Sequence, residues 1–137
     1  MLATRIGQDI GMRTLIYRSL ALWLIGYPEA ALADSNRAIA DAREIGQAAT
    51  LMGALNYTSL VYIHCGEYAA AKAGADEVVL LADQKGSTFW KAMGIMNQGC
   101  VLALTGMPSD AVRTIMSGMT AGDQRQLECI YRHTCLI

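Results

Sequence analysis

The chain has few charged residues and no excess of either sign. Charged residues make up 17% of its 137 positions, and its formal net charge is -1. Proteins that bind nucleic acid or anionic membranes through electrostatics concentrate Lys and Arg in one stripe or cluster. The sequence contains neither, so we expect no nucleic-acid partner and no membrane surface. Its 53% hydrophobic content is enough to build a core and argues against intrinsic disorder.

Motifs for nucleotide binding and hydrolysis are also missing. The sequence has no GxxxxGK(S/T) loop, no GxSxG elbow and no HExxH pair. The four cysteines form no CxxC pair, and Cys65 and Cys100 lie in apolar helical patterns that suit buried, reduced thiols. The first residues lack the apolar segment of a signal peptide. We therefore expect a cytoplasmic protein that holds no cofactor and no metal.

Two uncharged runs, residues 45–66 and 92–109, approach the length of about 20 apolar residues that crosses a bilayer. Both contain polar residues, such as Asn56, His64 and Asn97. Both also fall at the same phase of an internal repeat. We interpret them as helices packed by neighbours on two sides rather than as membrane spans.

Glycines at a fixed interval organise the chain. Gly26, Gly66 and Gly106 are forty residues apart, and each interrupts a helical pattern as a residue that adopts positive φ without strain. Pro28 and Pro108 then suit the first turn of a following helix. No strand-like alternation occurs, so we expect an all-α protein. The pattern predicts helices over residues 13–25, 28–45, 48–65, 68–85, 88–105 and 108–119.

Helix pairs at a fixed period are typical of a stacked solenoid, in which each pair buries its apolar faces against its neighbours. We expect one domain over residues 1–137, with units at about 7–46, 47–86 and 87–126. Residues 127–137 would be an incomplete fourth unit or an irregular tail. In the helix over 28–45 we expect Asp34, Arg37, Asp41 and Glu44 to form a solvated face.

Small residues recur where the paired helices should touch. Ala31, Ala71 and Ala111 each follow a turn glycine by five residues, and Ser19, Ser59 and Gly99 precede it by seven. A large residue follows three later, at Leu22, Tyr62 and Leu102. This pattern resembles tetratricopeptide repeats, although the period is forty residues and a closing proline is absent. The phrase ALWLIGYPEAAL is similar to the stretched repeats of large bacterial signalling proteins that carry an ATPase or adenylate/guanylate cyclase region.

The resemblance implies a right-handed α-solenoid of about three antiparallel helix pairs and a non-enzymatic interaction scaffold. It also implies a fragment of a larger signalling protein, with any ATPase or cyclase activity outside this chain. In this family the first helices line a concave face. Carried over, that groove comprises Arg13, Ile16, Leu20, Trp23, Leu24, Gly53, Asn56, Leu60, Ile63, His64, Met93, Met96, Cys100, Ala103 and Leu104.

The groove is mostly apolar, so we expect it to bind a protein or an apolar peptide segment. The missing domains of a parent protein could fill this role. Tight winding that buries much of the groove is the alternative. An uncapped solenoid end would also favour self-association.

Three other interpretations remain open. His64 and Cys65 could form a nucleophilic pair in a small helical enzyme, although both positions suit packing in a helix end. The protein could instead be a regulatory module that responds to a small molecule. Cys129, His133 and Cys135 combine metal-ligand types, but zinc sites usually have four ligands at tighter spacing.

Overall fold

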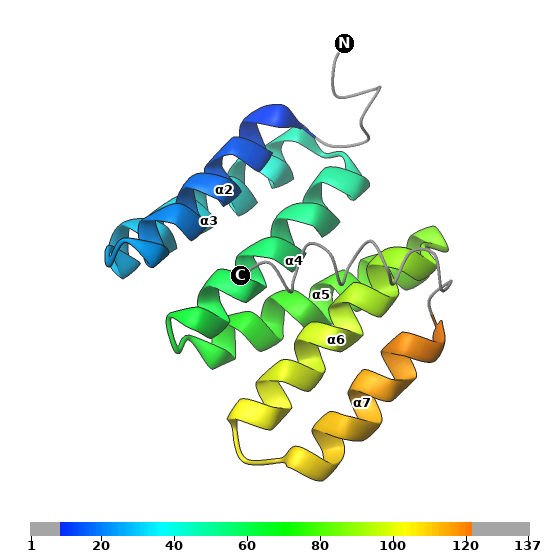
Figure 1. Cartoon of the computed structure of the whole chain (residues 1–137). Helices are drawn as coiled ribbons and strands as arrows, with labels where there is room; N and C mark the ends of the chain where they lie inside the picture. Colours follow the sequence, from blue (N-terminus) through cyan, green and yellow to red (C-terminus); the bar gives the residue numbers. More distant parts are fainter. Residues whose placement is uncertain (1–8, 122–137) are drawn as a thin grey trace.

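The computed structural model describes residues 9–121, which form six α-helices and no strand (Figure 1). The all-helical class is therefore confirmed for this part of the chain. No helix within residues 9–121 combines the length and the hydropathy needed to cross a bilayer. The helices are α2 (Ile10–Leu24), α3 (Pro28–Ile45), α4 (Ala48–His64), α5 (Tyr68–Lys85), α6 (Thr88–Leu104) and α7 (Pro108–Ala121).

Three nearly identical turns separate the members of each pair. Gly26, Gly66 and Gly106 have φ values of 91°, 80° and 88°, which favour glycine over any residue with a Cβ. The amide after each glycine donates to the carbonyl five residues earlier, for example from Tyr27 to Leu22 at 2.8 Å. These bonds satisfy carbonyls that the helix end leaves without partners. The turn glycines thus have the structural role that their spacing predicts.

The first helix begins three residues earlier than the sequence pattern predicts. Gly11 weakens the helical signal there, but the Asp9 carboxylate accepts a hydrogen bond from the Met12 amide at 2.9 Å and caps the helix. A capping side chain of this kind typically stabilises a helix by about 1 kcal/mol, which offsets the low propensity of one glycine.

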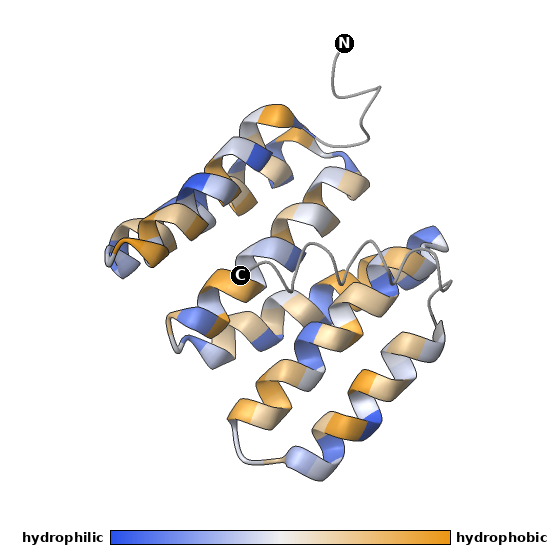
Figure 2. Cartoon of the chain, viewed as in Figure 1, coloured by the Kyte–Doolittle hydropathy of each residue, from blue (hydrophilic) through white to orange (hydrophobic). Residues whose placement is uncertain are grey.

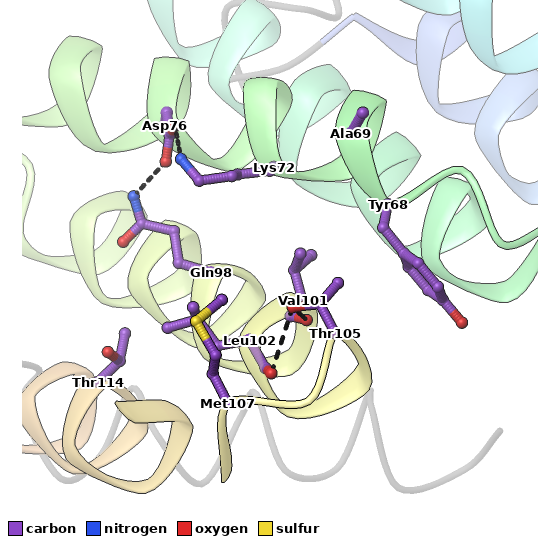
Figure 3. A pocket seen from close by; sticks show the side chains of 10 residues that line it. All are labelled: Tyr68, Ala69, Lys72, Asp76, Gln98, Val101, Leu102, Thr105, Met107 and Thr114. Atoms are coloured by element: carbon purple, nitrogen blue, oxygen red, sulfur yellow. Dashed lines mark hydrogen bonds and ion pairs between the residues drawn. The ribbon is translucent and has the colours of Figure 1, made fainter. Parts of the chain in front are cut away.

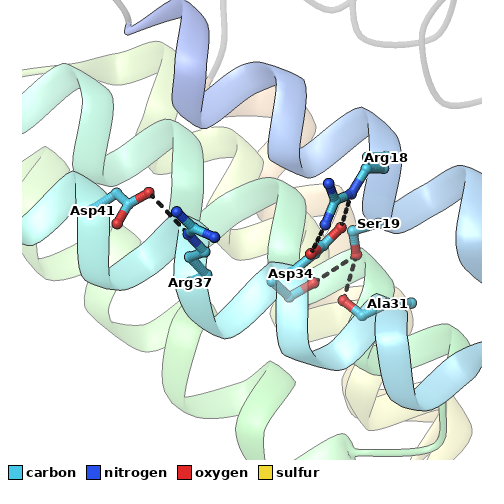
Figure 4. A network of polar contacts seen from close by, with 7 residues as sticks. Arg18, Ser19, Ala31, Asp34, Arg37 and Asp41 are labelled. Atoms are coloured by element: carbon cyan, nitrogen blue, oxygen red, sulfur yellow. Dashed lines mark hydrogen bonds and ion pairs between the residues drawn. The ribbon is translucent and has the colours of Figure 1, made fainter.

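Each helix packs against the helices before and after it, and α4 also contacts α2 and α6 (Figure 1). Small residues let the helix axes approach closely. Ala31, Ala71 and Ala111 are buried at the three pair contacts. The Ser19 hydroxyl donates to the Ala31 carbonyl at 2.7 Å and lies 2.8 Å from the Ser35 hydroxyl, so this buried crossing is hydrogen-bonded (Figure 4).

Asp34 was expected on a solvated face but is only 6% exposed. Both of its carboxylate oxygens accept from the Arg18 guanidinium, at 2.6 and 2.7 Å (Figure 4). The pairing explains the burial, because a carboxylate leaves water at low cost only when its lone pairs are satisfied. Arg37 does remain exposed, 3.9 Å from Asp41 on the same helix.

One stripe of α7 is apolar and open to solvent. Apolar and hydrophilic bands alternate along this helix in Figure 2. Val112, Met116 and Met119 are all exposed and lie at the helical spacing of one stripe. Leu32 and Ile39 of α3, the register equivalents of Val112 and Met119, are partly buried against the cluster of Tyr62, Ala71 and Val101.

Candidate binding groove

A surface cavity of about 380 Å³ lies where α2, α4 and α6 face the same side. We call it the groove cavity. Its walls are almost entirely apolar, and one imidazole is the only side chain with nitrogen among the lining residues. The lining residues are Leu20 of α2, Leu60, Ile63 and His64 of α4, and Cys100, Ala103 and Leu104 of α6.

The internal repeat explains why these side chains meet. Leu20, Leu60 and Cys100 occupy one register position in three successive units, and His64 and Leu104 share another. Because α4 packs between α2 and α6, equivalent positions of the three helices lie on one surface. All seven lining residues belong to the set carried over from the family resemblance.

Trp23 reaches the groove cavity through His64. The two rings stack with centroids 4.4 Å apart and 25° between their planes. Desolvation lowers the pKa of His64 from its ordinary value of 6.5, although the residue as a whole is exposed. The imidazole lies beside an apolar surface that disfavours its charged form.

Ile16, Asn56 and Met93 do not line a surface, because all three are buried. They were expected in the groove, but contacts of α2 and α6 with α4 cover these positions. The Asn97 amide nitrogen donates to both the backbone and the side-chain oxygen of Asn56, each at 3.0 Å. Close packing of α2 and α6 against α4 thus buries some of the residues that were expected to line the groove. Gly53 is buried as well.

Other expected residues lie away from the groove cavity. The Arg13 guanidinium donates to the Tyr17 hydroxyl at 3.2 Å and lies over that ring. Met96 is partly buried and Leu24 is exposed near the end of α2, but neither lines the cavity.

The neighbours His64 and Cys65 lack the features of an activated nucleophile. Desolvation and the nearby charge of Glu67 raise the pKa of the Cys65 thiol above its ordinary value. Catalytic cysteines have lowered pKa values, because the thiolate is the nucleophile. No hydrogen bond joins the two side chains in the described structure.

Metal ligands do not cluster in the part of the chain that the structure describes, where no three His, Cys, Asp or Glu side chains come together. The Cys129, His133 and Cys135 set lies outside residues 9–121.

A second cavity, of about 460 Å³, lies between α5, α6 and α7 (Figure 3). We call it the α5–α7 cavity. This cavity was not predicted from the sequence. The differences between equivalent residues of successive units could have indicated it. Lys72, Asp76 and Gln98 gather at one end, and Val101, Leu102 and Met107 lie away from it. The lining residues are Tyr68, Ala69, Lys72, Asp76, Gln98, Val101, Leu102, Thr105, Met107 and Thr114.

At its polar end, the Asp76 carboxylate accepts from Lys72 Nζ at 2.6 Å and from Gln98 Nε2 at 2.7 Å (Figure 3). The positive and negative charges therefore balance locally. Leu102 and Met107 contribute to the opposite, apolar part of the wall.

Comparison with protein-family models, with curated proteins and with solved structures finds no match for this chain.

Proposed function

We propose that the chain is a non-enzymatic interaction scaffold whose groove cavity binds an apolar helical segment of a partner protein. The observation that carries this proposal is the convergence of register-equivalent apolar residues from three helices on one surface. Leu104 is 52% exposed there, and Leu20, Leu60 and Ile63 add apolar wall around it. Exposed apolar surface of this kind favours association, because covering it removes it from water.

An amphipathic helix is the occupant that this apolar lining favours, because its apolar face would cover the leucines of the lining. Helices in grooves present residues at i, i+3, i+4 and i+7, spaced about 5–6 Å apart along one face. The groove cavity offers no cluster of cations for a peptide carboxylate, since His64 is the only basic residue in its lining.

We further infer that the helices form a right-handed solenoid of antiparallel pairs, as the resemblance to tetratricopeptide repeats implies. The repeated glycine turns and the contacts of α4 with α2 and α6 support this inference. By the same resemblance, the chain would be part of a larger bacterial signalling protein in the cytoplasm. Its own remaining domains would then be candidates to supply the apolar segment.

The raised pKa of Cys65 supports a non-enzymatic role over a nucleophilic one. A small-molecule response is the second candidate function, and the α5–α7 cavity is the observation that favours it.

Binding of a model helix would test the proposed groove. The probe is a fluorescent 14-residue peptide with Leu at one helical stripe and Glu and Lys elsewhere, measured by anisotropy. We expect saturable binding that Leu104→Asp weakens about tenfold or more, because a charge would be left in an apolar contact. Leu80→Asp is the matched control, since Leu80 is 58% exposed on α5 and lies outside the groove cavity.

A scrambled peptide of the same composition distinguishes recognition of an apolar helical stripe from non-specific hydrophobic binding. Equal affinity for both peptides, or equal losses for the two Asp variants, would contradict the proposed groove.

A further inference from the structure

We propose that the α5–α7 cavity binds a small neutral phenol. This inference concerns a different face from the groove cavity and does not depend on peptide binding there. The forty-residue register relates the contact between α5 and α6 to the contact between α3 and α4.

In the earlier copy of this contact, a tyrosine side chain fills the space between the helices. Tyr62 of α4 is only 7% exposed and belongs to an apolar cluster with Leu32 of α3. Its hydroxyl donates to Asn36 Oδ1 of α3 at 2.5 Å. The chain thus contains a phenol ring bound between two helices, with its hydroxyl held by a polar side chain.

In the later copy, all three of these residues have changed. Leu32 is replaced by Lys72, Asn36 by Asp76 and Tyr62 by Leu102. The three replacements all line the α5–α7 cavity. We attribute the space between α5, α6 and α7 to the smaller side chain of Leu102 and to Lys72, whose ammonium pairs with Asp76 where Leu32 packs in an apolar cluster.

The residues that remain retain the chemistry that holds a phenol. Asp76 Oδ1 and Oδ2 each accept one hydrogen bond, and a carboxylate has about four acceptor positions. It can therefore accept a hydroxyl where Asn36 accepts that of Tyr62. Leu102 offers apolar contact for a ring, and the Met107 sulfur is a favourable neighbour for an aromatic edge.

Charge and size narrow the class of ligand. Lys72 balances Asp76, so this end of the cavity has no net charge with which to attract a cationic or an anionic ligand. A neutral donor such as a phenolic hydroxyl needs no such attraction. The volume of about 460 Å³ falls within the range of roughly 300–1,000 Å³ that small-molecule sites occupy.

The test uses p-cresol, which is the side chain of tyrosine as a free molecule. In ¹H–¹⁵N spectra of the full chain, we expect saturable shifts at the amides of Asp76, Gln98 and Leu102. Amides around Leu20 and Leu60, in the groove cavity, should not shift. Toluene lacks the hydroxyl and should bind about tenfold more weakly, as expected for a lost hydrogen bond to a charged group.

Two variants assign the site. Leu102→Tyr should fill the cavity with an intramolecular phenol and weaken p-cresol binding at least tenfold. Val112→Tyr adds the same side chain at a position of α7 that is 57% exposed and should leave binding unchanged. Asp76→Ala should reduce affinity for p-cresol to that for toluene.

The proposal would be overturned by an absence of saturable shifts in the wild-type chain, by undiminished binding to Leu102→Tyr, or by equal affinities for p-cresol and toluene. Should Leu102→Tyr fail to fold, the wild-type shifts and Asp76→Ala still decide the matter. N-acetyl-tyrosinamide carries the same ring between peptide groups. Tighter binding of that compound than of p-cresol would assign the cavity to a partner's tyrosine and overturn the free-ligand assignment.

Discussion

Trp23 of α2 stacks on His64 of α4, with ring centroids 4.4 Å apart. Desolvation by burial lowers the pKa of His64 below its ordinary value of 6.5. The unfolded chain therefore binds a proton at this residue more readily than the folded chain does. The free energy of unfolding changes with pH according to the difference in bound protons between the two states. It should therefore be highest, as far as His64 is concerned, above pH 6.5 and should fall as the pH decreases through the pKa of the folded state.

This dependence can be measured as the urea midpoint between pH 8 and pH 5.5. His64→Gln should flatten the curve in that window, and His133→Gln is the comparison variant for the other histidine. An unchanged slope in His64→Gln would show that another group controls the transition.

Asn97 and Asn56 form a buried amide pair whose members depend on each other. The Asn56 side-chain nitrogen has no partner, so its oxygen accounts for the whole of its side-chain hydrogen bonding. Asn97→Leu should destabilise the chain by about 1–3 kcal/mol, because it leaves the Asn56 amide unsatisfied. Replacing both with Leu should recover most of that loss, since two apolar groups of similar size leave no orphaned polar atom. Urea unfolding of the two single variants and the double variant gives the coupling, and simple additivity would contradict the pairing.

Gly94 of α6 is needed for the close approach of α5. A Cβ at this position would lie 2.8 Å from Val79 Cγ2 and 3.1 Å from the Ala75 carbonyl oxygen. Gly94→Ala should destabilise the chain by about 1–3 kcal/mol through overpacking, although Ala favours a helix by up to about 1 kcal/mol. Val79→Ala removes the nearest methyl group, so the double variant should be more stable than the sum of the single changes predicts. Thermal melts of the wild type, the two single variants and the double variant measure this coupling. Additive effects of the two changes would contradict the predicted steric contact.

Cys65 and Cys100 should be slow to react at neutral pH. Burial raises the pKa of both thiols above the ordinary value of 9.0, with Glu67 adding to the effect at Cys65. The thiolate fraction at pH 7.5 is therefore smaller than in a free cysteine. In a Cys129→Ser/Cys135→Ser background, we expect modification by a disulfide reagent to be slower than for free cysteine and to accelerate in urea. A rate above that of free cysteine at Cys65 would instead favour the nucleophilic interpretation.

The helix boundaries could be predicted closely because the chain marks them with glycine. Gly46 and Gly86 end α3 and α5 with positive φ, and nothing from distant residues is needed to place them. Asp34 shows where such local reasoning ends. Its position on α3 indicates a solvated face, and only the approach of Arg18 from α2 makes burial favourable.

The groove could be predicted in part for the same reason. Equal register positions such as Leu20 and Leu60 meet wherever the units are alike. Asn56 and Met93 were placed incorrectly because the distance between successive first helices decides whether a position is surface or core. That distance depends on small residues in contacts that the pattern of a single helix does not specify.

Because each helix packs mainly on its near neighbours in the sequence, the ends of the chain can unfold separately from its middle. Between residues 9 and 121 the main contacts join helices that are adjacent or next but one in the sequence. Such a chain can fray from an end without dismantling its middle, because each unit is stabilised by its nearest neighbours. Separation of α2 would remove the Leu20 side of the groove cavity while Leu60 and Leu104 stayed together. A partner that contacts both α2 and α6 would therefore oppose the separation of α2. Part of its binding free energy would be used to keep α2 packed on the other helices.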